Sequence, residues 1–349
     1  MWAMIVKEFR QVRRDHRTLA MMIVMPVTLL VVFGYAASFD VSAIDTAVYG
    51  PGAEDVSALL PAPFEVAEVD SAGTDEMARA ELRRAQVVVA IVTGPEGPTA
   101  LIDGSQLFSA RAASQMLAAA APSFPGLEFE ILFNPDLETS AVLVPGLAGL
   151  ILLFVGTVIT SLGVVKERQA GTLEQLAVMP LRPTDVFVGK IAPYFLVASI
   201  DLVIVLVVGT ALFDVPFNGS FWLLGLGALM FLFVTLGLGV LISSVSQNQG
   251  QAIQLALMTL LPQVLLSGLI FPLDTMAAGV RWIGYLLPLT YFNLVAQGVM
   301  LRGAMFSDML FPLGLLAILG TVIFGLAVLR FRRDLASADK SVTTTRAAA

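Results

Sequence analysis

Long runs of apolar residues without charge dominate the hydropathy pattern of the chain. A helix rises about 1.5 Å per residue, so roughly 20 apolar residues cross the hydrocarbon core of a bilayer. Six such runs predict a membrane bundle of six transmembrane helices. They cover residues 19–37, 141–165, 191–213, 221–242, 252–271 and 310–329, and Asp201 interrupts the third of them. The first run is longer than the hydrophobic part of a signal peptide, so we expect it to remain in the membrane.

A different pattern fills residues 38–140, between the first two runs. Short extended apolar stretches alternate there with amphipathic helical ones, which predicts a small α/β domain. The predicted strands are residues 46–49, 64–69, 87–92, 100–102 and 127–133, and the predicted helices are residues 75–86 and 107–121. Glycine- and proline-rich turns separate these elements.

The composition supports the membrane prediction. Of the 349 residues 57% are apolar and only 13% are charged, whereas soluble domains carry about 25% charged residues. The chain has no cysteine, which excludes disulfides and thiolate metal sites. Its single histidine, His16, makes an imidazole metal site or a Ser-His-Asp triad improbable. No metal, no cofactor and no catalytic residue are therefore expected in this chain.

Basic residues indicate the orientation of the chain. Residues 1–18 contain five Lys or Arg, residues 330–349 contain five, and the loop 166–190 contains four. Cytoplasmic segments are enriched in such residues, so both termini and this loop are predicted to be cytoplasmic. The polar end of the tail, from Ser337 onward, is expected to be disordered.

Residues 38–140 have the opposite charge. They contain four arginines against 16 acids and carry −12, whereas the whole chain carries −7. We therefore place this domain outside the cytoplasm. The acids are scattered, which is typical of a solvated surface, and attraction of cationic substrates remains the alternative. Because this segment alone is more negative than the whole chain, the remaining residues are net basic.

The segment before the first run predicts an amphipathic helix at the inner membrane interface, residues 1–18. Apolar residues recur there at helical spacing, and basic residues occupy other faces. Anchoring is its expected role. Its basic side chains would also attract anionic lipid head groups.

The cytoplasmic loop 166–190 contains a helix-start signal. Thr172 and Gln175 can form a capping box, which predicts a short helix from Leu173 that ends before Pro180 and exposes Glu174. Such a helix, held between two spans, can carry the movement of a cytoplasmic partner into the membrane. An ordinary capped connector is the alternative.

This loop resembles the coupling segment of type-2 ABC transporter permeases, in the subgroup with a large extracytoplasmic domain. The matching residues are Glu167-Arg168, Gly171-Thr172-Leu173-Glu174-Gln175-Leu176, Pro180-Leu181-Arg182-Pro183 and Gly189-Lys190. Three further regions are similar to that family: residues 7–36, residues 101–105 with 133–135, and residues 266–273 with 288–298.

The resemblance implies a transport subunit rather than an enzyme. It implies two ABC ATPase subunits that bind ATP and Mg²⁺, a second permease chain, identical or homologous, and no nucleic acid. The coupling residues would be Glu167, Arg168, Gly171, Thr172, Leu173, Glu174, Gln175 and Leu176. This chain has no phosphate loop of its own, because Gly189-Lys190 is followed by Ile191. The expected location is the cell inner (plasma) membrane, among membrane lipids.

The segment 272–308 is too long for a plain turn and is rich in aromatic residues. Two short helices dipping into the membrane would need to pack against protein to satisfy their backbone groups. By resemblance they form re-entrant outer helices between spans 5 and 6, with Pro272, Pro288 and Tyr291 in an outer gate.

Asp201 lies near the middle of the third span, where a carboxylate costs about 2.5–3.5 kcal/mol by insertion scales. It is predicted to face protein or water. A functional role and a structural hydrogen bond to Ser243, Gln254 or Gln263 are both open. Glycines of the first two spans would allow close helix contact, within the chain or across a dimer: Gly34, Gly146, Gly149, Gly156 and Gly163.

The sequence therefore predicts an ABC exporter permease for a hydrophobic or amphipathic substrate such as a drug, natural product or lipid. By the same resemblance to type-2 ABC transporter permeases, import is the less frequent direction of transport. The alternative is a transmembrane sensor that signals with an ATPase and does not transport. An intramembrane enzyme is disfavoured, because the chain has no Gly-x-Ser-x-Gly motif and one histidine.

Overall fold

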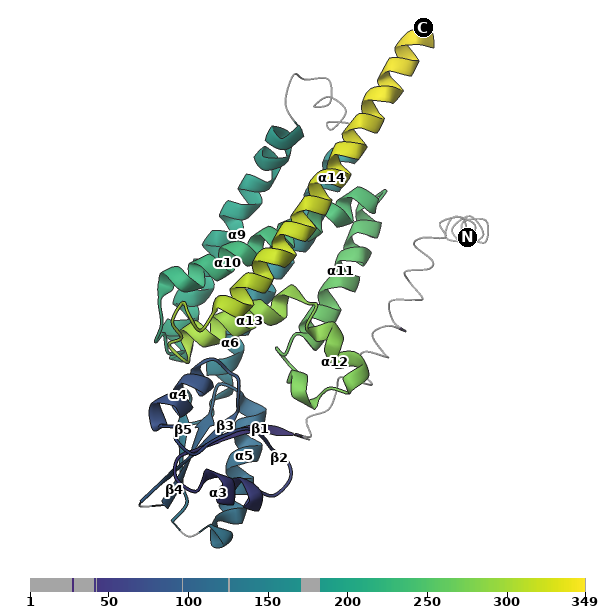
Figure 1. Ribbon diagram of the computed structural model, residues 1–349. Coiled ribbons are helices and arrows are strands. Elements are labelled where there is room, and N and C mark those ends of the chain that lie inside the picture. Colours follow the sequence, from purple (N-terminus) through teal and green to yellow (C-terminus); the bar gives the residue numbers. More distant parts are fainter. Residues whose placement is uncertain are drawn as a thin grey trace, which may run out of the picture.

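The computed structural model describes residues 27, 41, 43–95, 97–124, 126–170 and 183–348. Within them the chain forms a sheet with flanking helices, followed from residue 139 by a helical part. Figure 1 shows the sheet at one end of the molecule and the long helices extending away from it.

The sheet contains five strands in the order β2-β1-β3-β4-β5. Their bounds are β1 Ile44–Tyr49, β2 Phe64–Asp70, β3 Val89–Gly94, β4 Gly97–Asp103 and β5 Glu128–Leu132. The β3–β4 pair is antiparallel and the other neighbouring pairs are parallel. Parallel neighbours need a crossover, and helices supply each one. These are α3 (Ala53–Leu59), α4 (Asp75–Arg83) and α5 (Leu107–Ala120).

Both faces of the sheet are covered. Side chains alternate between faces along a strand, so Val48 packs with α3 and α5 while its neighbours Ala47 and Tyr49 pack with α4. Ala47 and Val48 are both fully buried. The result is a three-layer arrangement, with α4 on one face and α3 and α5 on the other.

Each strand and helix predicted between residues 46 and 133 has a counterpart here. The prediction missed α3, because its seven residues are too few to show a helical period. Gly50 and Gly52 have positive φ and redirect the chain from β1 into this helix.

Four stretches among the described residues are long and apolar enough to cross a membrane, at residues 139–167, 192–213, 221–245 and 310–330. They lie in α6 (Thr139–Phe154) with α7 (Thr160–Gln169), in α9 (Pro183–Phe213), in α10 (Phe221–Val245) and in α14 (Leu310–Ala348). These match the second, third, fourth and sixth predicted spans. The predicted span 19–37, apart from Val27, and the predicted interfacial helix fall outside the described residues.

The predicted fifth span, 252–271, corresponds to a shorter helix, α11 (Gln249–Leu266). It ends before Gly268, which has a φ of +83°, and it is not among the four long apolar helices. After it come a 3-10 turn, η3 (Leu273–Thr275), and two helices, α12 (Ala278–Gly284) and α13 (Pro288–Met300). The two short helices predicted in this segment are therefore present.

Helices extend further than predicted at two places. The loop predicted at 166–190 is shortened, because α7 continues to Gln169 and α9 begins at Pro183. Lys, Glu, Arg and Gln are good helix formers, and proline is favoured in the first turn. The tail predicted to be disordered continues α14 to Ala348. It contains no glycine or proline after Gly325 that would end the helix.

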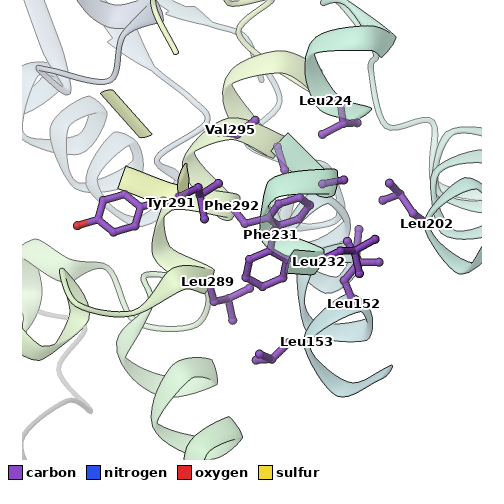
Figure 2. Packing of buried hydrophobic residues seen from close by; sticks show 14 of the residues in the cluster. Leu152, Leu153, Leu202, Leu224, Phe231, Leu232, Leu289, Tyr291, Phe292 and Val295 are labelled. Carbon is purple, nitrogen blue, oxygen red and sulfur yellow. The ribbon is translucent and has the colours of Figure 1, made fainter. Parts of the chain in front are cut away.

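The helical core forms around α10. The rings of Phe231 in α10 and Phe292 in α13 stack at a centroid distance of 4.7 Å, as Figure 2 shows. Leu152 and Leu153 of α6 lie beside them and are fully buried. This core fixes α13 against α6 and α10.

Glycines between residues 146 and 163, in α6, in α7 and in the segment that joins them, allow close packing within the chain. A Cβ on Gly149 would stand 2.5 Å from Phe292, and one on Gly156 would stand 2.1 Å from the hydroxyl of Thr235. Gly146 and Gly163 are similarly close to Leu269 and Tyr194. Four of the five predicted glycines thus serve contacts inside one chain, and Gly34 falls outside the described residues. At Gly156 the helix passes through a π-helical segment, η2 (Val155–Ile159).

Candidate functional site

A cavity of about 480 Å³ lies where the sheet domain meets the helical part. Its wall is formed by the first turn of α5, by α6, by residues 267–273 after α11 and by α13. Apolar side chains make up most of it, among them Leu107, Val142, Leu143, Leu269, Ile270 and Leu294. This volume falls in the range of small-molecule sites, about 300–1,000 Å³.

A buried arginine is among the residues of the cavity wall. Arg302 follows α13, and its Nη1 lies 3.7 Å from Oδ2 of Asp103 at the end of β4. The same Nη1 donates a hydrogen bond to Oγ of Ser105, at 2.9 Å. Both charged side chains are at most 1% exposed. An arginine buried this deeply requires a counter-charge, and Asp103 provides it.

Asp103 is held by its own loop. Its carboxylate accepts hydrogen bonds from the backbone N–H and hydroxyl of Ser105 and from the amide of Gln106. Burial raises the pKa of Asp103, and the nearby Arg302 guanidinium and the Ser105 hydrogen bonds oppose that rise. The geometry thus favours an ionised carboxylate more than burial alone would allow.

Two residues that line the cavity each have a buried polar side-chain atom without a hydrogen bond among the described residues. Nε of Arg302 and Oδ1 of Asn293 have no hydrogen-bond partner among the described residues. Asn293 uses only its amide nitrogen, which donates to the hydroxyl of Ser267 at 3.5 Å. Both residues line the cavity and are less than 5% exposed. Unpaired buried groups of this kind are rare in folded proteins, because each costs about 1–3 kcal/mol.

A second ion pair joins the same two parts of the molecule near the surface. Arg84, after α4, donates to Asp308, before α14, at 3.2 Å. Asp308 also accepts a hydrogen bond from the backbone of Met305. The loop between α13 and α14 is therefore attached to the sheet domain at Arg302 and at Asp308.

Comparison with known proteins decides the family. Residues 16–329 match the family described as "ABC-2 family transporter protein". The chain belongs to the ABC-2 family. It is 28% identical over 332 residues to the "Probable multidrug ABC transporter permease YbhS" of Escherichia coli K12, covering 86% of this chain and 88% of that one.

Two further relatives match over a smaller part of the chain. The "Inner membrane transport permease YhhJ" of Escherichia coli K12 is 34% identical over 215 residues, which is 60% of this chain and 56% of that one. The "ABC transporter G family member 20" of Dictyostelium discoideum is 29% identical over 170 residues, covering 49% of this chain and 23% of that one. The recognition of an ABC transporter permease from sequence motifs is thus confirmed.

The residues predicted to couple this ABC-2 protein to an ATPase are only partly described. Glu167 and Arg168 lie in the last turn of α7, not in a loop, and the Glu167 side chain is half-buried. Gly171, Thr172, Leu173, Glu174, Gln175 and Leu176 fall outside the described residues. Next to the end of α7, Gln249 of α11 donates to Gln169 at 3.0 Å.

The predicted gate residues cluster around α12 and α13. Pro272 and Tyr285 line the cavity, Pro288 begins α13, and the hydroxyl of Tyr291 donates to the backbone carbonyl of Tyr285. Tyr291 also packs edge-on against Phe311 of α14. The structure therefore brings these residues together beside the cavity, and their role as a gate stays a prediction.

Asp201 lies in α9 and is half-buried. None of its three predicted partners is hydrogen-bonded to it in the part of the chain that is described. Ser243 donates to the backbone of Val240, and the side-chain oxygens of Gln254 and Gln263 are buried with no hydrogen-bond partner in the described ranges. The described contacts therefore give no support to a structural hydrogen bond between Asp201 and these residues.

The sequence reasoning did not single out Arg302, Asp103 or Asn293 as site residues. One signal was available: Arg302 is one of two basic residues in the apolar segment 272–308. A charged side chain in such apolar surroundings needs a partner of opposite charge. That partner, Asp103, lies 199 residues away in the chain, so residue spacing could not identify it.

Proposed function

We propose that this chain is the permease subunit of an ABC exporter for a hydrophobic or amphipathic substrate such as a drug, natural product or lipid. One observation carries the proposal: a chain that matches a transporter family over residues 16–329 contains no Gly-x-x-x-x-Gly-Lys-Ser/Thr sequence. In this proposal a separate ATPase subunit supplies the energy. The largely apolar cavity supports the class of substrate.

The proposed arrangement has six spans in the inner membrane, with both termini in the cytoplasm. The basic termini and the basic loop 166–190 support this orientation, as does the acidic segment 38–140. The sheet domain then lies outside. In this arrangement α12 and α13 are the re-entrant outer helices, and the cavity lies at the outer end of the pathway.

Movement of the ATPase would reach the cavity along one continuous helix. Residues 139–169 run without interruption through α6, η2 and α7. Glu167 and Arg168 lie at one end of this helix, and Val142 and Leu143, which line the cavity, lie near the other. A push on the coupling residues is thus delivered to the cavity wall. Nucleotide drives the cycle only if it binds the inward and outward states with different affinity.

The close crossing at η2 provides the pivot for this movement. Thr157 donates to the backbone carbonyl of Thr235 in α10, at 3.3 Å. A Cβ on Gly239 of α10 would stand 2.7 Å from the carbonyl oxygen of Gly156. With no side chain between the two backbones, the helices can turn about this contact.

The proposed complex contains two ATPase subunits and a second permease chain. In the apolar 18-residue window of the 192–213 stretch of α9, only 17% of the residues are buried in this chain. Its exposed side chains include Leu196, Val207 and Leu212. Lipid or the second permease would cover this apolar surface.

A sensor that signals with an ATPase without transporting is the second candidate. The attachment of the sheet domain through Arg302 and Asp308 favours it, because a ligand on that domain would act directly on the loop before α14. Loss of signalling without a change in the distribution of any substrate would identify the sensor.

Copurification tests the subunit assignment. The chain is solubilised in detergent with candidate ATPase subunits from its own cell, and wild type is compared with Glu174→Arg. We expect one ATPase to copurify with wild type and to be lost with the variant. If no ATPase is recovered under any nucleotide condition, the exporter proposal fails.

A further inference from the structure

The joint between the sheet domain and α6 is built around one buried asparagine. Asn134 follows β5 and is 5% exposed. Its Nδ2 donates to the backbone carbonyls of Gly104, at 3.2 Å, and Glu138, at 3.0 Å. Its Oδ1 accepts from the backbone N–H of Glu138 at 3.0 Å, and Glu138 is the residue directly before α6. One side chain therefore binds the start of α6 to the loop that follows β4.

The backbone around Asn134 leaves this joint little room to bend. Its N–H donates to the carbonyl of Leu132 at 2.8 Å, and its carbonyl accepts from the N–H of Leu137 at 3.0 Å. A Cβ on Gly104 would stand 2.7 Å from the carbonyl oxygen of Asn134, so the two segments touch backbone to backbone. Arg111 of α5 also donates to the carbonyl of Leu137, at 2.8 Å. Segments open easily where such contacts are few, so this joint holds the sheet domain and α6 in one orientation.

The loop after β4 reaches Arg302 on its other side. Asp103 and Ser105 flank Gly104, and Nη1 of Arg302 lies 3.7 Å from Oδ2 of Asp103 and 2.9 Å from Oγ of Ser105. Arg302 is in turn attached to α13, because its Nη2 donates to the backbone carbonyl of Leu294 at 3.3 Å. These three consecutive loop residues thus link the start of α6 to the end of α13.

The wall of the cavity is shared between the two sides of this link. The sheet domain and α6 form one side and contribute Leu107, Val142 and Leu143. Residues 267–273 and α13 form the other side. Figure 1 shows α6 leaving the sheet domain next to α13. A displacement of one side against the other therefore changes the width of the cavity.

We propose that the sheet domain and α6 move as one rigid body, with Asn134 as the positioning residue, and that residues 103–105 relay a displacement of α6 to Arg302 and the cavity wall. The use of this relay in transport rests on the proposed function, in which the ATPase pushes on the helix that begins with α6. The relay itself lies within this chain, so it is measured without an ATPase.

Distances between pairs of spin labels test the relay. The chain contains no cysteine, so two introduced cysteines carry the only labels. Glu76→Cys/Leu147→Cys joins α4 to α6, and Glu76→Cys/Ser307→Cys joins α4 to the loop before α14. All three positions are exposed among the described residues. The purified full chain is placed in lipid nanodiscs and diluted with unlabelled chain, and both pairs should give a narrow distance distribution.

Removing the joint tests its rigidity. Asn134→Ala loses all three side-chain hydrogen bonds, so it should broaden the distribution of the Glu76/Leu147 pair. Asn218→Ala is the matched control, because Nδ2 of Asn218 also donates to a backbone carbonyl, that of Leu301 at 2.9 Å, but lies between α9 and α10. The control should give the wild-type distribution. An unbroadened distribution in Asn134→Ala would overturn the proposal.

Releasing Arg302 tests the other half of the relay and does not depend on how Asn134→Ala folds. The variant R84Q/D103N/R302A removes both ion pairs that attach the sheet domain to the α13–α14 loop, and it leaves neither buried charge unpaired. We expect the Glu76/Ser307 distribution to broaden while the Glu76/Leu147 distribution stays narrow, because Asn134 is intact.

Two results of the release experiment would overturn the relay. If both pairs broaden, the sheet domain and α6 do not move as one body. If neither broadens, the contacts of Arg302 and Asp308 do not carry the link. The copurification experiment fails independently: a rigid joint without a copurifying ATPase would leave the relay standing and remove the exporter assignment.

Discussion

The guanidinium of Arg302, after α13, lies 3.7 Å from the carboxylate of Asp103 at the end of β4, and both side chains are buried. This pair joins the sheet domain to the helical part at the edge of the cavity. A change in the position of either part would therefore alter the wall of the cavity.

Replacing Arg302 with Gln should destabilise the protein strongly. The substitution leaves Asp103 buried without its counter-charge, which typically costs about 3–5 kcal/mol. The thermal unfolding midpoint in detergent should fall well below that of wild type. The double variant D103N/R302Q removes both charges and should recover part of the loss.

Arg84→Gln is the matched comparison for that result. Its ion pair with Asp308 joins the same two parts, but the Arg84 side chain is 44% exposed. Exposed pairs contribute about 0–1 kcal/mol, so the midpoint should fall only slightly. If the midpoint falls as far as in Arg302→Gln, burial of the Arg302–Asp103 pair adds nothing to its contribution to stability.

Gly156→Ala should disturb the crossing at η2. The new Cβ would stand 2.1 Å from the hydroxyl and 2.6 Å from the Cβ of Thr235. Overpacking of this kind costs about 1–3 kcal/mol. In Gly225→Ala, also in a helix, nothing lies within 4 Å of the new atom, so that control should be neutral or slightly stabilising. Equal thermal unfolding midpoints for the two variants would contradict the close contact between Gly156 and Thr235.

Tyr291→Phe should loosen the turn between α12 and α13. It removes the hydrogen bond from the hydroxyl to the carbonyl of Tyr285 and keeps the packing of the ring against Phe311. We expect a loss of about 0.5–1.5 kcal/mol and faster amide hydrogen exchange in residues 285–287. Unchanged exchange there would show that the hydrogen bond does not hold the turn.

Asp201→Asn should leave folding nearly unchanged, because no hydrogen bond or ion pair of Asp201 occurs among the described residues. Its position in an apolar helix favours a role in transport, so transport should decrease. Thermal unfolding and transport are measured on the same preparation. If both equal wild type, a charge-dependent role is ruled out.

Local pattern was sufficient to predict most elements of the fold. Short extended apolar runs marked β1 and β3, and long apolar runs marked α9 and α10. The prediction placed the end of α11 five residues too late, since Ser267–Phe271 is as apolar as the helix before it. The positive φ of Gly268 ends that helix, and hydropathy does not report backbone angles.

The site was less accessible from the sequence. Pro272 and Tyr291 were singled out and lie beside the cavity, but the pairing of Arg302 with Asp103 joins distant parts of the chain. Such a contact depends on how the sheet domain docks on α13. Neither the local hydrophobic period nor the spacing of motifs depends on that docking, so neither can predict the pair.

Transport by the reconstituted complex tests the central claim most directly. The chain and its copurified ATPase are placed in liposomes with the ATPase outside, and uptake of tritiated hydrophobic and amphipathic probes, a drug and a lipid among them, is followed with ATP. The account predicts uptake that requires ATP hydrolysis and is lost with Glu174→Arg. Uptake that is the same with and without ATP, in a complex that hydrolyses it, would contradict the exporter function.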